Sequence, residues 1–242
     1  MRIITVNDYE EMSLVAARFL AAQLLLKPSS VLGLATGSTP EGMYAHLVRM
    51  YEQEGLDFSR ATCFNLDEYL GLSSDHPQSY HFYMERHLFS KVNLPPTRRR
   101  LPETDGKDPE LSCLAYEKEI AQAGGIDLQV LGIGVNGHIG FNEPDDKFTA
   151  ATHIVDLEES TIEANARFFG SRDEVPRRAM TMGVGSIFKA EKILLLASGA
   201  SKAKAVHEAL RGAIRPQLPA SILQLHSQVI CIIDREAASL LR

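Results

Sequence analysis

The sequence is short of cysteine, of long apolar runs and of positive charge, and each shortage excludes a class of protein. Its three cysteines are odd in number, widely spaced and form no CxxC pair, which speaks against a disulfide framework or a zinc cluster. No apolar run approaches the ~20 residues that a membrane-spanning helix needs. The first residues, MRIITVNDYEEM, lack the apolar core of a signal peptide. We therefore expect a reduced, cytoplasmic protein without a membrane segment.

Positive charge is also scarce, with 25 Lys and Arg against 31 Asp and Glu and a net charge of −6. A general nucleic-acid or membrane-surface role would favour a basic face, so neither partner is expected. An anionic substrate in a locally positive pocket stays compatible with this charge. At 242 residues, with 45% apolar residues, the chain is long enough to bury a full core. It contains no repeat or linker, and we expect a single α/β domain over residues 1–242.

Apolar runs of strand length alternate with segments of helical periodicity along almost the whole chain. The predicted strands are 2–6, 30–35, 61–66, 126–131, 153–156, 193–197 and 228–233. The predicted helices are 8–26, 41–53, 78–90, 109–123, 159–169, 201–210 and a last one from 234. This alternation predicts an open, mainly parallel Rossmann-like sheet with helices on both faces. In such a sheet, ligands bind outside the carboxyl ends of the strands.

The first unusual strand end is LATGSTP, between a predicted strand and an amphipathic helix. Backbone N–H groups at a helix N-terminus attract anions, and the hydroxyls of Thr36, Ser38 and Thr39 add donors. Gly37 lets the loop turn, but no Walker A pattern is present. A plain capping turn, with Thr39 as the cap and Pro40 in the first helical position, is compatible with an anion site.

A second strand end carries the acidic pair Asp67–Glu68, in NLDEYLG. Acidic side chains directly after a buried strand lie at the mouth of the sheet. Asp67 is the better candidate for chemistry, because the strand exit fixes its position more tightly. For a lone carboxylate, a capping role or a solvated loop position is the alternative.

The third strand end, LGIGVNGHIGFNEP at 131–144, is the richest in chemistry. Its glycines let the backbone turn sharply and approach a ligand. The GxGxxG spacing from Gly132 to Gly137 matches the dinucleotide fingerprint, but no helix opens after the last glycine, so that interpretation fails. His138 and Glu143 have no third metal ligand at a recognisable spacing. Acid–base roles suit them better.

Two basic residues could complete a phosphate site. Lys202, in LLASGASK, follows a predicted strand and lies in the first turn of a predicted helix, where the helix dipole favours anions rather than cations. A bound phosphate would explain that placement, and a surface lysine is the alternative. Arg167 lies beside two aromatic residues in EANARFF, and an arginine can contact phosphate in a bidentate manner.

Together these stretches resemble the glucosamine-6-phosphate deaminase (isomerase) family. TGSTP at 36–40, NLDEYLGL at 65–72, GHIGFNEP at 137–144, ANARFF at 164–169 and SGASKA at 198–203 occur in the family's order and spacing. The glycine loops are weak signals one by one, whereas NLDEY followed by GHIGFNEP is specific. The resemblance covers essentially the whole chain.

The resemblance implies conversion of glucosamine 6-phosphate and water to fructose 6-phosphate and ammonia, without a metal or organic cofactor. By motif, Asp67 would move the C2 proton to C1, and a water-poor site would raise its basicity. His138 would assist opening of the sugar ring. Glu143 would orient and polarise that imidazole, and Asn136 would complete the group. The 6-phosphate would be bound by Thr36, Gly37, Ser38, Thr39, Arg167 and Lys202.

The chain departs from better-known members of that family in two ways. Those members carry an aspartate at position 136, whereas an amide can accept a hydrogen bond but supplies no charge to an imidazolium. We therefore expect Glu143 to carry more of the electrostatic work. The chain also ends at Arg242, without the C-terminal extension of allosteric hexameric members, and His153 and Val155 do not match their basic effector-binding residues. We expect hyperbolic kinetics, and the sequence leaves open whether the protein forms a homo-oligomer.

The resemblance also implies a mobile lid at about 156–182, whose closure would bring Arg167 to the phosphate and exclude water. An ordinary covering helix is the alternative. The nearest competing function is 6-phosphogluconolactonase, which shares the fold, the phosphate loop and a Gly-His motif, whereas NLDEYLGL favours the deaminase. A silent sugar-phosphate sensor would lack an acid–base residue, yet Asp67, His138 and Glu143 are all present.

Overall fold

The computed structural model of the protein describes residues 1–104, 106 and 108–241. At its centre lies a parallel sheet with the strand order β1-β10-β9-β6-β2-β3-β5. Its strands are β1 (Arg2–Val6), β2 (Val31–Leu34), β3 (Thr62–Asn65), β5 (Arg99–Arg100), β6 (Leu128–Leu131), β9 (Lys192–Ala197) and β10 (Val229–Asp234). All neighbouring strands pair in parallel. The predicted mainly parallel α/β sheet is thus confirmed.

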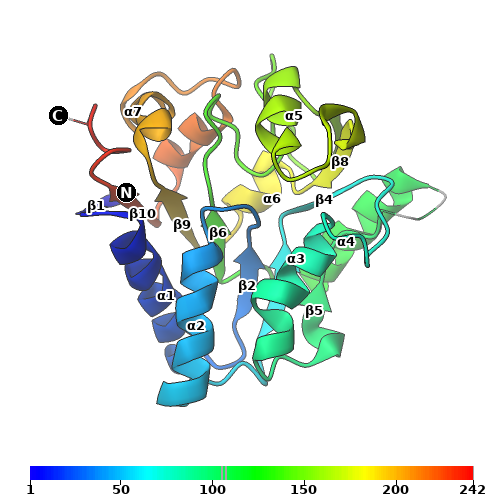
Figure 1. Ribbon diagram of the computed structural model, residues 1–242, viewed down its shortest axis with the longest axis vertical. Coiled ribbons are helices and arrows are strands. Elements are labelled where there is room, and N and C mark those ends of the chain that lie inside the picture. The colour runs from blue at the N-terminus through cyan, green and yellow to red at the C-terminus, as the bar shows by residue number, and fades with distance from the viewer. Residues whose placement is uncertain (105, 107, 242) are drawn as a thin grey trace.

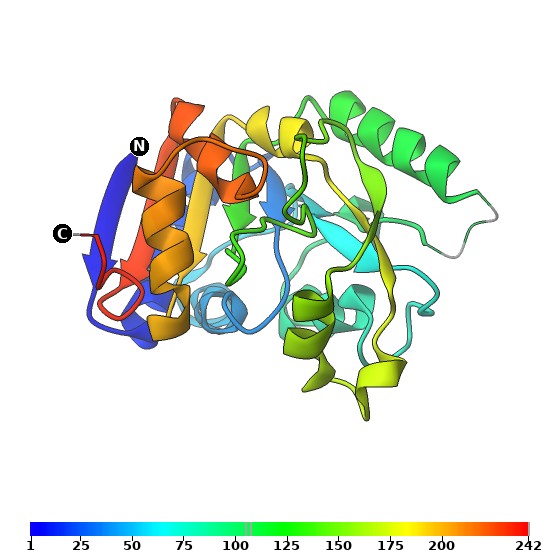
Figure 2. The same cartoon turned by 90° about the horizontal axis from the view of Figure 1, so that it is seen from above.

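Helices cover both faces of this sheet, which is why every residue of β2 and β6 is buried. The helices are α1 (Tyr9–Leu26), α2 (Glu41–Glu54), α3 (Tyr80–His87), α4 (Pro109–Gln122), α5 (Glu159–Ala166), α6 (Val184–Phe188) and α7 (Ala203–Arg211). On one face α1, α2 and α3 lie side by side (Figure 1). The view from above places α4 and α6 behind the opposite face (Figure 2).

Side-chain caps fix where several helices begin. Asp8 accepts a hydrogen bond from the N–H of Glu11 at the start of α1. Ser79 does the same for α3, and Asp108 for α4, which has a proline in its first turn. Such caps satisfy N–H groups that have no partner inside the helix.

A second, antiparallel sheet lies beyond the main one and was not predicted as a sheet. Its strand order is β4 (Asp67–Tyr69), β8 (Arg178–Thr181) and β7 (His153–Asp156). The sequence predicts β7 but neither β4 nor β8. This sheet carries its own apolar cluster, composed of Tyr69, Phe141, Leu157, Ile162, Val175 and Ala179. Because β4 begins two residues after β3 ends, it carries the NLDEY motif out of the main sheet.

Other predicted boundaries also need correction. The predicted helix from 234 is wrong, because β10 runs to Asp234 and residues 235–240 form turns. The carboxylate of Asp234 caps the first of these turns by accepting the N–H of Ala237 at 2.8 Å. The predicted helix 78–90 is shorter, with α3 followed by the 3-10 helix Phe89–Lys91. Among the described residues, no helix is both long and apolar enough to cross a membrane.

Candidate active site

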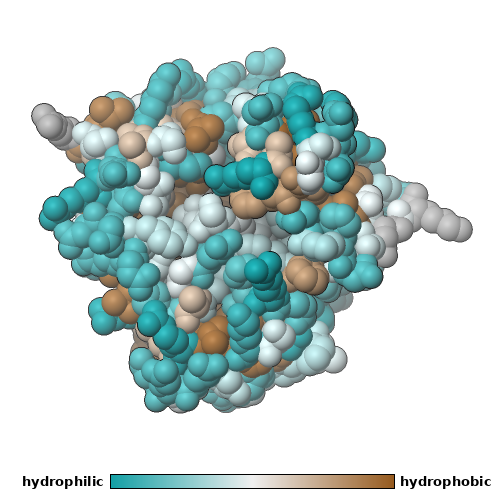
Figure 3. Space-filling view, viewed as in Figure 1, coloured by the Kyte–Doolittle hydropathy of each residue, from teal (hydrophilic) through white to brown (hydrophobic). Residues whose placement is uncertain are grey.

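A pocket opens outside the carboxyl ends of β2, β3 and β6, at the edge to which the strand arrowheads point in Figure 1, and Lys202 reaches it from the turn after β9. The same face seen as a surface is hollowed below the overhang formed around α5 (Figure 3). Nine of the ten predicted site residues line this pocket: Thr36, Gly37, Ser38, Thr39, Asp67, Asn136, His138, Arg167 and Lys202. The tenth, Glu143, lies behind the imidazole of His138. Carboxyl ends of parallel strands share one sheet edge, and this brings together residues far apart in sequence.

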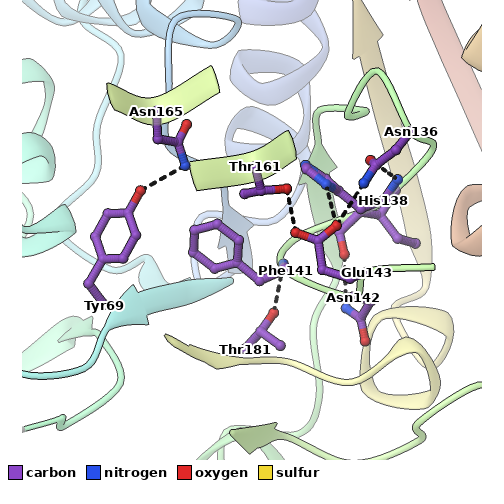
Figure 4. A network of polar contacts seen from close by, with 10 residues as sticks. Tyr69, Asn136, His138, Phe141, Asn142, Glu143, Thr161, Asn165 and Thr181 are labelled. Atoms are coloured by element: carbon purple, nitrogen blue, oxygen red, sulfur yellow. Dashed lines mark hydrogen bonds and ion pairs between the residues drawn. The ribbon is translucent and has the colours of Figure 1, made fainter. Parts of the chain in front are cut away.

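Glu143 is the centre of a network of polar contacts (Figure 4). Its Oε2 lies 3.1 Å from Nδ1 of His138, and the side-chain amide of Asn136 donates to the same oxygen at 2.8 Å. Its other oxygen, Oε1, accepts a hydrogen bond from the hydroxyl of Thr161 on α5. A carboxylate held at both oxygens fixes the ring orientation of His138 and leaves the opposite ring nitrogen for the pocket.

Asn136 does not contact the imidazole ring as an acceptor. Its Oδ1 instead accepts the backbone N–H of His138 at 3.2 Å, and its Nδ2 is used by Glu143. The amide therefore holds the loop and the carboxylate, and Glu143 is the group that faces the ring. That the carboxylate does the electrostatic work stays a prediction.

The protonation of Glu143 is set by opposing effects. Burial disfavours its ionised form, but the hydrogen bond and the positive charge of His138 outweigh it, with help from Thr161 and Asn136. The net result is a pKa below the ordinary value for glutamate. Glu143 is therefore a carboxylate over the whole physiological pH range.

The loop that carries Glu143 is fastened to the second sheet. The N–H of Phe141 donates to the hydroxyl of Thr181 at 3.1 Å, and the amide of Asn142 donates to the carbonyl of Met182 at 2.8 Å. These bonds place GHIGFNEP between the two sheets. The second sheet thus positions the His138–Glu143 pair, which sequence patterns did not predict.

Asp67 lies on β4 as a buried carboxylate at the pocket wall, with 6% of its surface exposed. Burial, and then the negative charge of Glu68, raises its pKa well above the ordinary value. A carboxylate whose ionised form is disfavoured is a stronger base than an exposed one.

Glu68 has a structural role. Its two oxygens accept the backbone N–H groups of Tyr69, Tyr80 and His81, each at 2.9 Å. It therefore joins β4 to the N-terminus of α3, where a carboxylate is stabilised by free N–H groups. This explains why Asp67, rather than Glu68, is available for chemistry.

Two cations approach the other end of the pocket. The guanidinium of Arg167 is 3.5 Å from the hydroxyl of Ser38 and stacks over the ring of Phe168 at 4.6 Å. Lys202 ends the 3-10 helix Ala200–Lys202, immediately before α7 rather than inside its first turn. Burial, and then the charge of Arg167, lowers the pKa of Lys202. Two cations placed near each other in a half-buried site favour an anionic ligand.

The loop between β2 and α2 completes that end. Pro40 is the N-cap residue of α2 and no side chain caps this helix, so the predicted capping by Thr39 is not formed. Gly37 has φ +89°, a left-handed conformation that favours glycine. The loop therefore turns back at the pocket, and within the described residues the backbone N–H groups of residues 36–39 have no protein acceptor, as an anion site requires. Within the described residues, no group of three or more His, Cys, Asp or Glu is arranged to hold a metal ion.

Comparison with known proteins supports one family. A family model described as glucosamine-6-phosphate isomerases/6-phosphogluconolactonase matches residues 10–231. The glucosamine-6-phosphate deaminase of Thermoanaerobacter sp. (strain X514) is 56% identical over 241 residues, covering 100% of this chain and 95% of that one. The chain belongs to this family.

Solved structures place this member of the glucosamine-6-phosphate isomerase family among its relatives. A monomeric glucosamine-6-phosphate deaminase has a TM-score of 0.97 and 51% identity, covering 99% of this chain and 100% of that one. The 6-phosphogluconolactonase from Thermotoga maritima has a TM-score of 0.75 at 22% identity, over 96% of this chain and 99% of that one. The second likeness shows a shared fold.

The sequence analysis did not identify several residues that line the pocket. Thr161, Asn165 and Phe168 lie on one side of α5 and its C-terminal end, all lining the pocket. Their spacing of four and three residues is that of a helix face, which was a usable signal. Tyr80 gave no such signal, because its position depends on the bond between Glu68 and α3.

Proposed function

We propose that the protein is a glucosamine-6-phosphate deaminase of amino-sugar catabolism, acting in the cytoplasm on a small sugar phosphate. It converts glucosamine 6-phosphate and water to fructose 6-phosphate and ammonia. One observation carries the proposal. A buried carboxylate of raised pKa, an imidazole–carboxylate pair and two cations line or support the same pocket. Close relatives that bear the name deaminase support the same reaction.

The phosphate end orients the substrate. The loop Thr36–Thr39 offers N–H groups and hydroxyls, and Arg167 and Lys202 supply charge. Charge-assisted hydrogen bonds of this kind are stronger than neutral ones and fix the direction of a bound phosphate. The sugar then extends from this end toward His138 and Asp67.

Ring opening is assigned to His138. The free ring nitrogen moves a proton between the anomeric hydroxyl and the ring oxygen, so that the C1–O5 bond breaks and an aldehyde forms at C1. Glu143, ionised over the working pH range, stabilises the imidazolium when His138 carries the proton. Asn136 keeps Glu143 in place.

Isomerisation is assigned to Asp67. The carboxylate takes the C2 proton of the open chain, giving an enolamine, and returns that proton to C1. The resulting imine at C2 is hydrolysed by water, which releases ammonia and leaves the ketone of fructose 6-phosphate. The apolar surroundings that raise the pKa of Asp67 make it an adequate base for a proton on carbon.

The segment 156–182 acts as a lid in this proposal. Arg172 pairs with Glu159 and with Glu163, the latter at 3.4 Å, so that α5 and the following turn move together. Strand β8, paired on both sides, is the fixed end of the segment. Closure would tighten Arg167 on the phosphate and exclude water from Asp67.

The test is a direct assay of both products. Wild-type protein should release ammonia and fructose 6-phosphate from glucosamine 6-phosphate in equal amounts. Asp67→Asn keeps the shape of the side chain and should lower kcat by about 10²- to 10⁴-fold, the range for loss of a general base. Hydrolysis of 6-phosphogluconolactone without ammonia release would instead identify a lactonase.

A further inference from the structure

The turn after β2 is held from behind by the hydroxyls of three tyrosines. Tyr44 on α2 donates to the carbonyl of Ala35 at 2.6 Å. Tyr83 on α3 donates to the carbonyl of Gly37 at 2.7 Å, and Tyr9 on α1 donates to the carbonyl of Ser38 at 2.9 Å. The three tyrosines come from three helices, and the sequence separates them by more than thirty residues each.

Each of these bonds fixes a whole peptide unit. In a trans peptide the C=O and the following N–H lie in one plane and point in opposite directions. The described residues contain no cis peptide bond. A carbonyl drawn toward the helices therefore aims the next N–H away from them. The bonds to Ala35, Gly37 and Ser38 set the N–H groups of Thr36, Ser38 and Thr39 in this way.

The backbone N–H groups and the backbone carbonyls of this loop differ in whether they have protein partners. Within the described residues, the backbone N–H groups of residues 36–39 donate to no other protein group, whereas three carbonyls of the loop are engaged by tyrosines. All four residues line the pocket. A run of unengaged N–H groups directed at a cavity forms a concave anion-binding surface.

We propose that Tyr9, Tyr44 and Tyr83 are positioning residues that hold the phosphate loop with its N–H groups toward the bound phosphate. The hydroxyls draw the partial negative charge of the carbonyls away from the anion and fix the loop before binding. A preorganised loop loses less conformational entropy when the ligand arrives. The inference rests on the phosphate role that the proposed function gives to this loop.

Two of the tyrosines, Tyr44 and Tyr83, are suited to hold the loop at any working pH. Burial raises the pKa of Tyr44 and of Tyr83 far above the ordinary value, so both remain O–H donors. Their rings pack edge to face with centroids 6.4 Å apart. Tyr9 makes two hydrogen bonds to this segment. Its hydroxyl donates to the carbonyl of Ser38, and its oxygen also accepts the N–H of Gly42 at 2.9 Å.

The experiment removes one hydroxyl at a time, in Tyr9→Phe, Tyr44→Phe and Tyr83→Phe. Calorimetric titration with inorganic phosphate measures the affinity of the site directly, and steady-state kinetics separate KM from kcat. Each variant should weaken phosphate binding and raise KM by about three- to tenfold, the worth of one hydrogen bond. The value of kcat should change much less, because Asp67 and His138 are untouched.

Tyr116→Phe is the matched control. The buried hydroxyl of Tyr116 donates to the carbonyl of Asn65 at 2.7 Å, at a neighbouring strand end outside the loop. This variant should lose thermal stability without losing phosphate affinity. If the three loop variants also lose only stability, with phosphate affinity equal to that of wild type, the proposal is overturned. Should Tyr44→Phe fail to fold, the phosphate affinities of Tyr9→Phe and Tyr83→Phe, at half-buried positions, test the proposal.

The titration also separates this proposal from the proposed function. Inorganic phosphate needs no turnover, so wild type that binds phosphate but releases no ammonia would reject the deaminase while the loop variants still test the tyrosines. Wild type that binds no phosphate at millimolar concentration would overturn the positioning role itself.

Discussion

The side-chain amide of Asn136 donates a 2.8 Å hydrogen bond to Oε2 of Glu143. An aspartate at this position would place two carboxylates at that distance. Two carboxylates so close share a proton, which raises one apparent pKa of the pair. The amide thus avoids a coupled pair next to His138.

Asn136→Asp should therefore move the acid limb of the pH profile. Glu143 of the wild type is ionised well into the acid range, because the contacts with His138 overcome burial and lower its pKa. In the variant one carboxyl of the pair retains its proton to higher pH. The acid limb of kcat/KM should shift upward by about one pH unit or more.

A surface pair of the same geometry serves as the control for that variant. Asn93 donates its amide to Oδ1 of the exposed Asp57 at 2.7 Å, and neither residue lines the pocket. Asn93→Asp should leave the pH profile of kcat/KM in place. Equal profiles for wild type and Asn136→Asp would contradict the account of the amide.

Asp67→Asn should stabilise the fold while it removes activity. Burial and the charge of Glu68 raise the pKa of Asp67 above its value in the unfolded chain, so this group costs stability progressively as the pH rises above that unfolded value. Removal of the charge should raise the free energy of unfolding by about 1–3 kcal/mol at pH 7. The gain should be absent below about pH 3.9, where aspartate is protonated even in the unfolded chain.

Urea unfolding of both proteins at neutral and acid pH measures this gain. A buried charge that is costly in the fold but needed in the reaction is a usual trade between stability and activity. Equal or lower stability of Asp67→Asn at pH 7 would show that the carboxylate is well solvated or paired, against the geometry of β4.

The main sheet and most of the site could be predicted from the sequence because both follow from local patterns. Buried parallel strands are apolar runs, and their carboxyl ends must share an edge, so Thr36, Asp67, His138 and Lys202 were expected to meet. The pocket confirms that expectation. The chemistry assigned to each residue remains a proposal.

What could not be predicted depends on contacts between distant segments. Strand β4 is three residues long and begins with two carboxylates, so no alternation of apolar residues marks it. Its pairing with β8 exists because Tyr69 and Ala179 share an apolar cluster. The closing helix was predicted wrongly because Asp234 caps a turn and engages Gly199 at 2.9 Å. Tyrosines at 9, 44 and 83 share no pattern at all.

Gly134→Ala should impair His138 directly. A Cβ at Gly134 would lie 2.5 Å from Nε2 of His138, closer than real Cβ atoms approach. The ring cannot simply yield, because Glu143 holds its other nitrogen at 3.1 Å. We expect kcat to fall by about 10²-fold, since small displacements of a reacting group are costly.

Gly132→Ala is the matched control in the same loop. A Cβ there meets no atom within 4 Å, so a much smaller loss of kcat is expected. Steady-state kinetics of both variants, with circular dichroism to confirm folding, give the comparison. Equal losses at the two positions would mean that backbone freedom, and not the space for the imidazole, is what the loop requires.

Lys202 should cause kcat/KM to decline at alkaline pH. Burial, and then the charge of Arg167, lowers its pKa from the ordinary 10.5, so free enzyme loses this charge at a lower pH than an exposed lysine would. As pH rises through that pKa, phosphate affinity falls and kcat/KM for glucosamine 6-phosphate declines, because kcat/KM reports the free enzyme.

The variant Lys202→Arg keeps a cation that does not titrate in this range. The value of kcat/KM for this variant should be lower than that of the wild type, but it should stay constant over the pH range in which the wild-type value declines. Lys204→Arg, at an exposed position in α7, should retain the wild-type decline. A decline that persists unchanged in Lys202→Arg would assign the limb to another group.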